Sequence, residues 1–249
     1  MNTSILITAR LKSTRLKKKV LKPILGRPML SHMVERLRLA KKPDNIILIT
    51  STVTQDDELE AYAKEEGIDC FRGDPDDVLV RMRDAANVFD VDTVISCTAD
   101  NPFVDPIYID KLIDFHTLHK NDFSKCDGLP FGTFSYAINR AAIQQACDIK
   151  DEVDTEVWGG YFTDNKQFQC GTFIVDDPDV CWPNLRLTVD TEEDFSLVTN
   201  IFSRLSNNSK KIFGLKEIVK LCRDYPELIA INSHIEQKKG NPIKIKKSL

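Results

Sequence analysis

The 249-residue sequence lacks the features that would place it in a membrane or outside the cell. Its seven cysteines are scattered, with no two closer than eleven positions, so no CxxC pair is present to hold zinc or to run dithiol chemistry. No charged and apolar secretory pattern opens the chain, and no run of about eighteen apolar residues could span a membrane. These absences predict a cytoplasmic protein with reduced thiols and no membrane partner.

A net positive charge is also missing. The formal net charge is −4, whereas a dedicated nucleic-acid-binding domain is usually basic overall. Internal repeats and long linkers are absent as well. We therefore predict a single domain over residues 1–249 that has no nucleic-acid partner.

Cations are nevertheless concentrated at one place, directly after a strand-like run at residues 4–8. Seven of them fall between Arg10 and Lys22, with the hydroxyls of Ser13 and Thr14 among them. A basic stretch is more often a solvated face or a non-specific nucleic-acid patch. This one follows the first strand of an α/β pattern, where nucleotides usually bind, and its donors suit a polyphosphate.

Strand-like runs alternate with helical patterns through the first half, which is typical of βαβ units and a largely parallel sheet. Strands are predicted near 4–8, 45–50, 69–71, 92–97, 133–138, 167–174 and 185–189, and helices near 30–37, 57–66, 76–88, 106–119, 192–205 and 215–224. The pattern changes over about 126–180, where two more helices are expected. We interpret this segment as an insertion for acceptor binding and dimer contact. Residues 237–249 contain five lysines and are predicted to form a frayed, solvated end.

Two aspartates at predicted strand ends are candidate metal ligands. Asp100 follows the strand at 92–97, and Asp190 follows the last predicted strand. Mg²⁺ is usually bound by one or two carboxylates together with phosphate oxygens and water. An aspartate before a helix is more often a structural cap, but Thr191 and Asp194 already supply a capping-box-like start. Asp190 is therefore left free for a metal.

Four blocks of the sequence resemble the sugar-acid cytidylyltransferases. The blocks are the opening, which runs from Arg10 through Ser13-Thr14-Arg15-Leu16 and Lys19-Val20-Leu21 to 23–30, the stretch 71–81, the stretch around Asp100 and the stretch around Asp190. That family includes the CMP-KDO and CMP-acylneuraminate synthetases and the SpsF-like spore-coat polysaccharide proteins, and the SpsF-like branch looks closest. The blocks occur in the family's order over about 190 of the 249 residues. One departure is that this chain has Lys17-Lys18 where the family often has Pro-Gly.

The resemblance implies a three-layer, Rossmann-like nucleotidyltransferase fold with a mostly parallel mixed sheet and a small inserted dimerisation and acceptor sub-domain. It implies transfer of CMP from CTP to a sugar acid or related anionic acceptor, with release of pyrophosphate, Mg²⁺ as cofactor and a homodimeric assembly. The catalytic residues that it implies are Arg10, Lys19, Asp100 and Asp190, with both aspartates on the metal. The nucleotide-binding residues that it implies are Ala9, Arg10, Ser13, Thr14, Arg15, Lys19, Arg72 and Asp77.

Two other functions remain as alternatives. A nucleotide-sugar-dependent glycosyltransferase of similar fold would typically carry Asp-X-Asp after the central strand, whereas this chain has Asp100-Asn101-Pro102. A non-catalytic nucleotide-binding protein could use the same cationic loop. Release of pyrophosphate from CTP would distinguish the first function from both.

Overall fold

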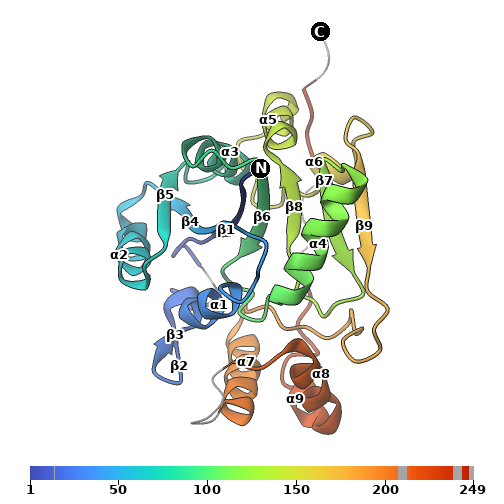
Figure 1. The fold of residues 1–249 in the computed structure, drawn as a ribbon. Helices are drawn as coiled ribbons and strands as arrows, with labels where there is room; N and C mark the ends of the chain where they lie inside the picture. The colour runs from blue at the N-terminus through green and yellow to red at the C-terminus, as the bar shows by residue number, and fades with distance from the viewer. Residues whose placement is uncertain (14, 207–211, 238–242, 247–249) are drawn as a thin grey trace.

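The computed structural model describes residues 1–13, 15–206, 212–237 and 243–246. Within them, seven strands form a sheet in the order β5-β4-β1-β6-β8-β7-β9, beside a two-stranded hairpin, β2-β3 (Figure 1). The strands are β1 (Thr3–Thr8), β2 (Pro23–Ile24), β3 (Arg27–Pro28), β4 (Asn45–Ser51), β5 (Asp69–Gly73), β6 (Thr93–Thr98), β7 (Phe123–Asp127), β8 (Tyr136–Asn139) and β9 (Cys170–Ile174). The pairings of the sheet are parallel except where β8 runs against β6 and β7.

Helices cover both faces of this sheet and make three layers (Figure 1). They are α1 (Met29–Leu37), α2 (Asp57–Glu66), α3 (Val78–Val88), α4 (Pro106–His119), α5 (Arg140–Ile149), α6 (Gly160–Thr163), α7 (Glu192–Leu205), α8 (Leu215–Asp224) and α9 (Pro226–Ala230), with short 3₁₀ turns η1 (Lys19–Leu21) and η2 (Thr54–Asp56). Because side chains alternate along a strand, Ile5 and Ile7 pack with α1, α2 and α4, while Leu6 packs with α3, α5 and α6. The predicted three-layer α/β fold is confirmed.

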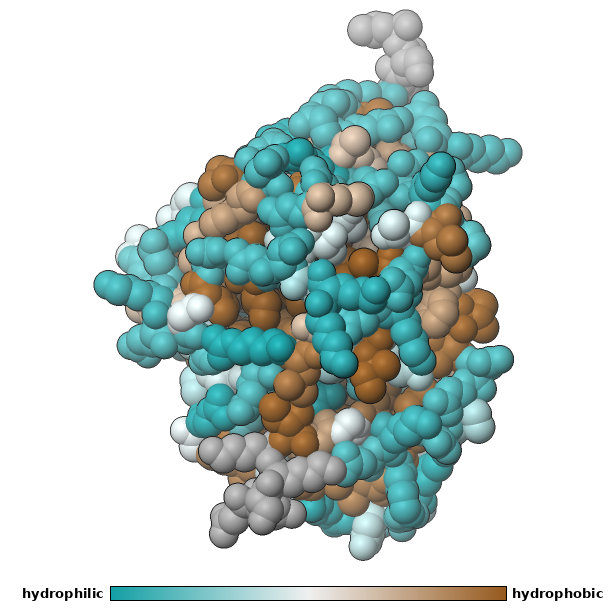
Figure 2. All heavy atoms as spheres, viewed as in Figure 1, coloured by the Kyte–Doolittle hydropathy of each residue, from teal (hydrophilic) through white to brown (hydrophobic). Residues whose placement is uncertain are grey.

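The surface agrees with this layering. Hydrophilic side chains cover most of the face shown in Figure 2, with smaller apolar areas between them. Among the described helices, none is both long and apolar enough to cross a lipid bilayer.

Residues 185–189 do not form the predicted strand of the main sheet. The backbones of Leu185 and Leu187 exchange two hydrogen bonds of 2.8 Å with Phe131, and the contact is an isolated bridge. The segment that contains Phe131 turns away at Gly132, whose φ is +92°, so the bridge does not extend into a ladder. The alternating apolar residues that suggested a strand are buried in an extended segment at the carboxyl edge of the sheet.

The segment 126–180 contributes strands to the main sheet as well as peripheral structure. It supplies β8, β9, α5 and α6, and it begins inside β7, a strand that was not predicted. β7 was missed because Ser124 is polar, although its hydroxyl is buried between the His116 ring, at 2.9 Å, and the Asn121 amide, at 3.0 Å. A buried strand position thus looked like a surface loop.

Part of the carboxyl-terminal tail is held against the body, so the predicted frayed end is wrong for residues 243–246. Lys150 and Ile245 form an antiparallel bridge, flanked by two backbone hydrogen bonds of 2.8 Å. Ile243 packs against the same apolar cluster as α5 and α6. Ile245 is itself exposed, so the bridge holds this part of the tail through its backbone and Ile243 supplies the apolar contact. Residues 238–242 and 247–249 lie outside the described part of the chain.

Candidate active site

The cationic loop between β1 and α1 is pinned to the core by apolar side chains. Leu11, Leu16 and Val20 are each at most 2% exposed, and the Leu11 N–H donates to Asp56 Oδ1 at 2.7 Å. A cavity of about 450 Å³ on this loop is lined by Leu11, Lys12, Ser13, Lys17, Lys18 and Gln55. Three lysines of the loop therefore line one cavity. Ala9, at its start, is buried with its N–H bonded to the Ile49 carbonyl at 3.1 Å, and Thr14 lies outside the described residues.

Lys18 has the backbone conformation of a glycine. Its φ and ψ are 49° and 34°, in the left-handed region that glycine enters freely and L-residues enter only with strain. This is the position at which the resembled family often has the glycine of Pro-Gly. A lysine therefore holds the left-handed conformation here, directly before η1, which begins at Lys19.

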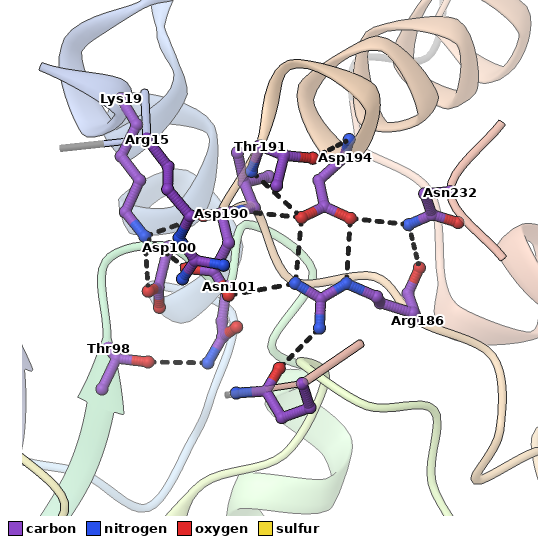
Figure 3. Close-up of polar contacts among 12 residues, drawn as sticks. Arg15, Lys19, Thr98, Asp100, Asn101, Arg186, Asp190, Thr191, Asp194 and Asn232 are labelled. Carbon is purple, nitrogen blue, oxygen red and sulfur yellow. Dashed lines mark hydrogen bonds and ion pairs between the residues drawn. The ribbon is translucent and has the colours of Figure 1, made fainter. Parts of the chain in front are cut away.

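Lys19 bridges the two aspartates that were predicted to meet (Figure 3). Its ammonium lies 2.9 Å from Asp100 Oδ2 and 2.9 Å from Asp190 Oδ1, and it also donates to the Val189 carbonyl at 2.8 Å. Burial on its own lowers the pKa of Lys19, but the two carboxylate charges and their hydrogen bonds outweigh it and raise the pKa above the usual range. Lys19 is therefore a fixed positive charge.

Asp190 is held from its other side by a second group of residues (Figure 3). Arg186 donates to Asp190 Oδ2 at 3.0 Å and to both oxygens of Asp194 at 2.9 Å. Arg15 approaches Asp190 Oδ1 at 3.3 Å. Burial on its own raises the pKa of Asp190. The charge of Lys19, followed by Arg15 and Arg186, outweighs burial and lowers the pKa below the usual range, so the carboxylate stays ionised.

Asp194 explains why Asp190 is free to face Lys19. As predicted, Thr191 and Asp194 form a capping box at the start of α7, so Asp190 is not the cap. Asp194 also accepts from the Asp190 N–H at 2.9 Å and from the Asn232 amide at 2.8 Å. The predictions from sequence did not include Arg186, Asp194 or Asn232 in the site. The capping-box spacing was the one signal that pointed to Asp194.

The aspartate pair fits a hard divalent cation that shares its coordination with a ligand. The Lys19 ammonium shows that one cation can contact both carboxylates at 2.9 Å. Among the described residues no third His, Cys, Asp or Glu joins them to complete a protein cage. Two carboxylates with the remaining positions left to phosphate oxygens and water are typical of Mg²⁺ sites.

Arg10 lies away from the aspartate pair and faces the loop after β5. Its guanidinium donates to the Pro75 carbonyl and lies 3.5 Å from Asp76 and 3.9 Å from Glu156. Arg81, which is completely buried, donates to the same Pro75 carbonyl at 3.0 Å. Burial, followed by the repulsion of Arg10, lowers the pKa of Arg81 to about 10. Two cations thus converge on one backbone carbonyl.

Two other predicted nucleotide-binding residues have mainly structural contacts. Arg72 is paired with Asp57 and Glu60 of the α2 region, at 2.7 and 2.8 Å. Asp77 caps α3, and it also accepts from Thr155 at 2.8 Å and pairs with Lys150. The structure therefore separates these two side chains from the Lys19 cluster, and their contact with a nucleotide stays a prediction.

This arrangement defines a nucleotidyltransferase, with a three-layer sheet, a cationic loop after β1 and paired aspartates at the carboxyl edge. Comparison with known proteins agrees. Residues 4–224 match the family described as Cytidylyltransferase. The spore coat polysaccharide biosynthesis protein SpsF of Bacillus subtilis is 30% identical over 229 residues, which cover 89% of this chain and 94% of that protein.

Two further proteins extend the comparison. An 8-amino-3,8-dideoxy-manno-octulosonate cytidylyltransferase from Shewanella is 31% identical over 169 residues, 66% of this chain and 65% of that protein. A solved cytidylyltransferase structure from Leptospira borgpetersenii superposes with a TM-score of 0.84 at 24% identity, covering 96% of this chain and all of the other. The chain belongs to the cytidylyltransferase family, as the sequence blocks predicted.

Proposed function

We propose that this protein transfers CMP from CTP to a sugar acid or related anionic sugar and releases pyrophosphate, in a Mg²⁺-dependent reaction. The observation that carries the proposal is the meeting of Lys19, Asp100 and Asp190 beside the cationic loop. The acceptor class follows the sugar acid named for the Shewanella relative. A glycosyltransferase is less well supported, because Asp100-Asn101-Pro102 stands after the central strand in place of Asp-X-Asp and the family is that of cytidylyltransferases.

In the proposed reaction the acceptor hydroxyl oxygen bonds to the α-phosphorus. The bond from that phosphorus to the bridging oxygen of the leaving pyrophosphate breaks in line, and the hydroxyl proton passes to water. Lys19, Arg10 and Arg15 hold the triphosphate and stabilise the charge that develops on the leaving group.

Asp100 and Asp190 are the proposed metal ligands, and Arg186 with Asp194 fixes the orientation of Asp190. A bound Mg²⁺ would neutralise phosphate charge and make the acceptor hydroxyl more acidic. We propose that the acceptor binds beside segment 126–180, where the guanidinium carbon of Arg186 lies 5.9 Å from the centroid of the Phe131 ring. This segment is also the proposed dimer contact, and light scattering would test the homodimer. The proposed cellular compartment is the cytoplasm.

The decisive experiment measures pyrophosphate release from CTP with Mg²⁺ and a panel of keto-deoxy sugar acids, nonulosonic acids and phosphorylated or phosphonate acceptors. Asp100→Asn and Asp190→Asn should each lower the rate on the order of 10²-fold or more with the fold intact, because each removes one ligand of the proposed metal. Pyrophosphate release at a near-normal rate in either variant would remove that aspartate from the proposed site.

Base choice is a separate test of the proposal. A site that hydrogen-bonds cytosine leaves donors and acceptors unpaired when uracil enters, at about 1–3 kcal/mol for each buried group. Two such mismatches predict roughly 10²-fold or greater preference for CTP over UTP. Equal turnover of UTP, ATP or GTP with the true acceptor would defeat the cytidylyl assignment and leave nucleotidyl transfer standing.

A further inference from the structure

The Lys19 ammonium occupies the position between Asp100 and Asp190 that a shared cation would take. It has three N–H donors, and the structure gives it three acceptors within 2.9 Å: the two carboxylates and the Val189 carbonyl. The side chain of Lys19 is only 14% exposed, and that of Asp190 is 12% exposed. The site is thus already coordinated from within the protein.

The charges of the surrounding cluster cancel. Contacts of 3.3 Å or less join three cations to three carboxylates: Lys19, Arg15, Arg186, Asp100, Asp190 and Asp194. A divalent cation that entered this cluster alone would add positive charge with no partner and would also have to displace Lys19. Both effects are costly in a partly desolvated site.

A triphosphate changes this balance. Its oxygens are acceptors for an ammonium, and its negative charge can compensate both Lys19 and a metal. When Lys19 turns to the phosphates, it leaves oxygens of Asp100 and Asp190 free. The phosphates can also complete the coordination that the two aspartates begin.

We propose that Lys19 is an internal counter-ion that keeps metal out of the nucleotide-free protein and releases the aspartates when the triphosphate binds. This inference rests on the proposed function for the identity of the nucleotide. Because Lys19 cannot serve the aspartates and the phosphates at once, nucleotide and metal must bind with positive coupling, and each raises the affinity for the other. Lys19 acts here as a positioning residue for the metal ligands.

The test is a titration of nucleotide-free protein with Mn²⁺, followed by the electron paramagnetic resonance signal of free Mn²⁺. Lys19→Met keeps the length of the side chain and removes its charge. It should bind one Mn²⁺ at least about tenfold more tightly than the wild type, because the competing ammonium is gone. Lys17→Met, the same change two residues away on the cavity wall, should leave Mn²⁺ affinity as in the wild type. Adding Asp190→Asn to Lys19→Met should abolish the gained site.

Lys19→Gln gives a second neutral variant if the methionine impairs folding, and circular dichroism checks both. Tight Mn²⁺ binding by the nucleotide-free wild type, or unchanged affinity in the neutral Lys19 variants, would overturn the inference. The experiment uses neither CTP nor an acceptor, so its result is separate from that of the pyrophosphate assay. An enzyme active with CTP whose free form binds Mn²⁺ tightly would refute the counter-ion and leave the proposed function intact.

Discussion

Substitution of Asp194 by Asn should destabilise the protein far more than its distance from the chemistry suggests. The carboxylate is completely buried and accepts five hydrogen bonds, two from Arg186 and one each from the Asp190 N–H, the Thr191 N–H and the Asn232 amide. Asparagine keeps the shape but loses the charge and turns one acceptor into a donor. Of the two ion pairs that Arg186 makes with described residues, the one with Asp190, at 3.0 Å, remains.

Breaking a buried ion pair costs about 3–5 kcal/mol. Because Arg186 keeps its contact with Asp190, we expect Asp194→Asn to lower the free energy of unfolding by an amount near the lower end of this range, about 3 kcal/mol. For a chain of this size that corresponds to a melting temperature lower by roughly 6–12 °C. Urea and thermal unfolding measured by circular dichroism give the value directly.

Asp224→Asn is the matched control for this measurement. Asp224 pairs with Lys220 at 2.6 Å on the surface of α8, where such pairs contribute about 0.3–0.5 kcal/mol. The control should therefore change the free energy of unfolding by less than about 0.5 kcal/mol. If Asp194→Asn proved as stable as this control, the buried cluster would not be holding Asp190 in the way described.

Three other perturbations test separate parts of the structure. Lys18→Gly should leave the free energy of unfolding within about 1 kcal/mol of the wild type, because relief of left-handed strain offsets the lost ion pair with Glu58. Lys18→Val should lower the free energy of unfolding by about 1–2 kcal/mol, because valine is strained in that conformation. Equal urea midpoints for the two variants would contradict this. Arg10→Ala should weaken CTP binding at least about tenfold by calorimetry, and an unchanged dissociation constant would take Arg10 out of the nucleotide site. Burial lowers the pKa of His116 below its ordinary 6.5, and the hydrogen bond with Asn139 offsets this only in part. The unfolded chain therefore binds the proton more readily than the folded one, so the free energy of unfolding falls as pH drops below about 6.5. His116→Gln should make the loss of melting temperature between pH 7.5 and 5.5 smaller, and an unchanged loss would show that other groups cause it.

Elements with strong periodicity could be predicted from the sequence, and so could the place of Asp100. The predicted helices at 106–119 and 192–205 match α4 and α7 at both ends. Asp100 follows a buried strand, so it was expected at the carboxyl edge of the sheet, on the same side as the cationic loop. The structure places Asp100 Oδ2 2.9 Å from the Lys19 ammonium. Asp190 also reaches Lys19, but from an extended segment where a strand of the main sheet was predicted. Their roles in catalysis remain predictions.

The support behind Asp190 could not be predicted in the same way. Arg186 lies in an apolar alternating run that resembles a strand, so its charge indicated a solvent-facing position. Its partners Asp194 and Asn232 are eight and 46 positions away, and no local pattern links an arginine to an amide at that distance. Tertiary packing, which buries the guanidinium against α7 and the segment after α9, decides these contacts.

The position of the aspartates along the chain also sets when the site can exist during synthesis. Strands β1, β4, β5 and β6 lie within the first 98 residues and can pair early in synthesis. Asp100 lies 81 positions after Lys19 in the sequence, and Asp190 lies 171 positions after it. At about 5–20 residues per second, the second aspartate follows the lysine by roughly 9–34 s. During that interval the nascent chain would carry a paired sheet, with Glu58 and Asp76 already present as partners of Lys18 and Arg10, and a Lys19 that still lacks Asp190. A chain that ends before residue 190 would lack one of the two aspartates of the proposed metal site.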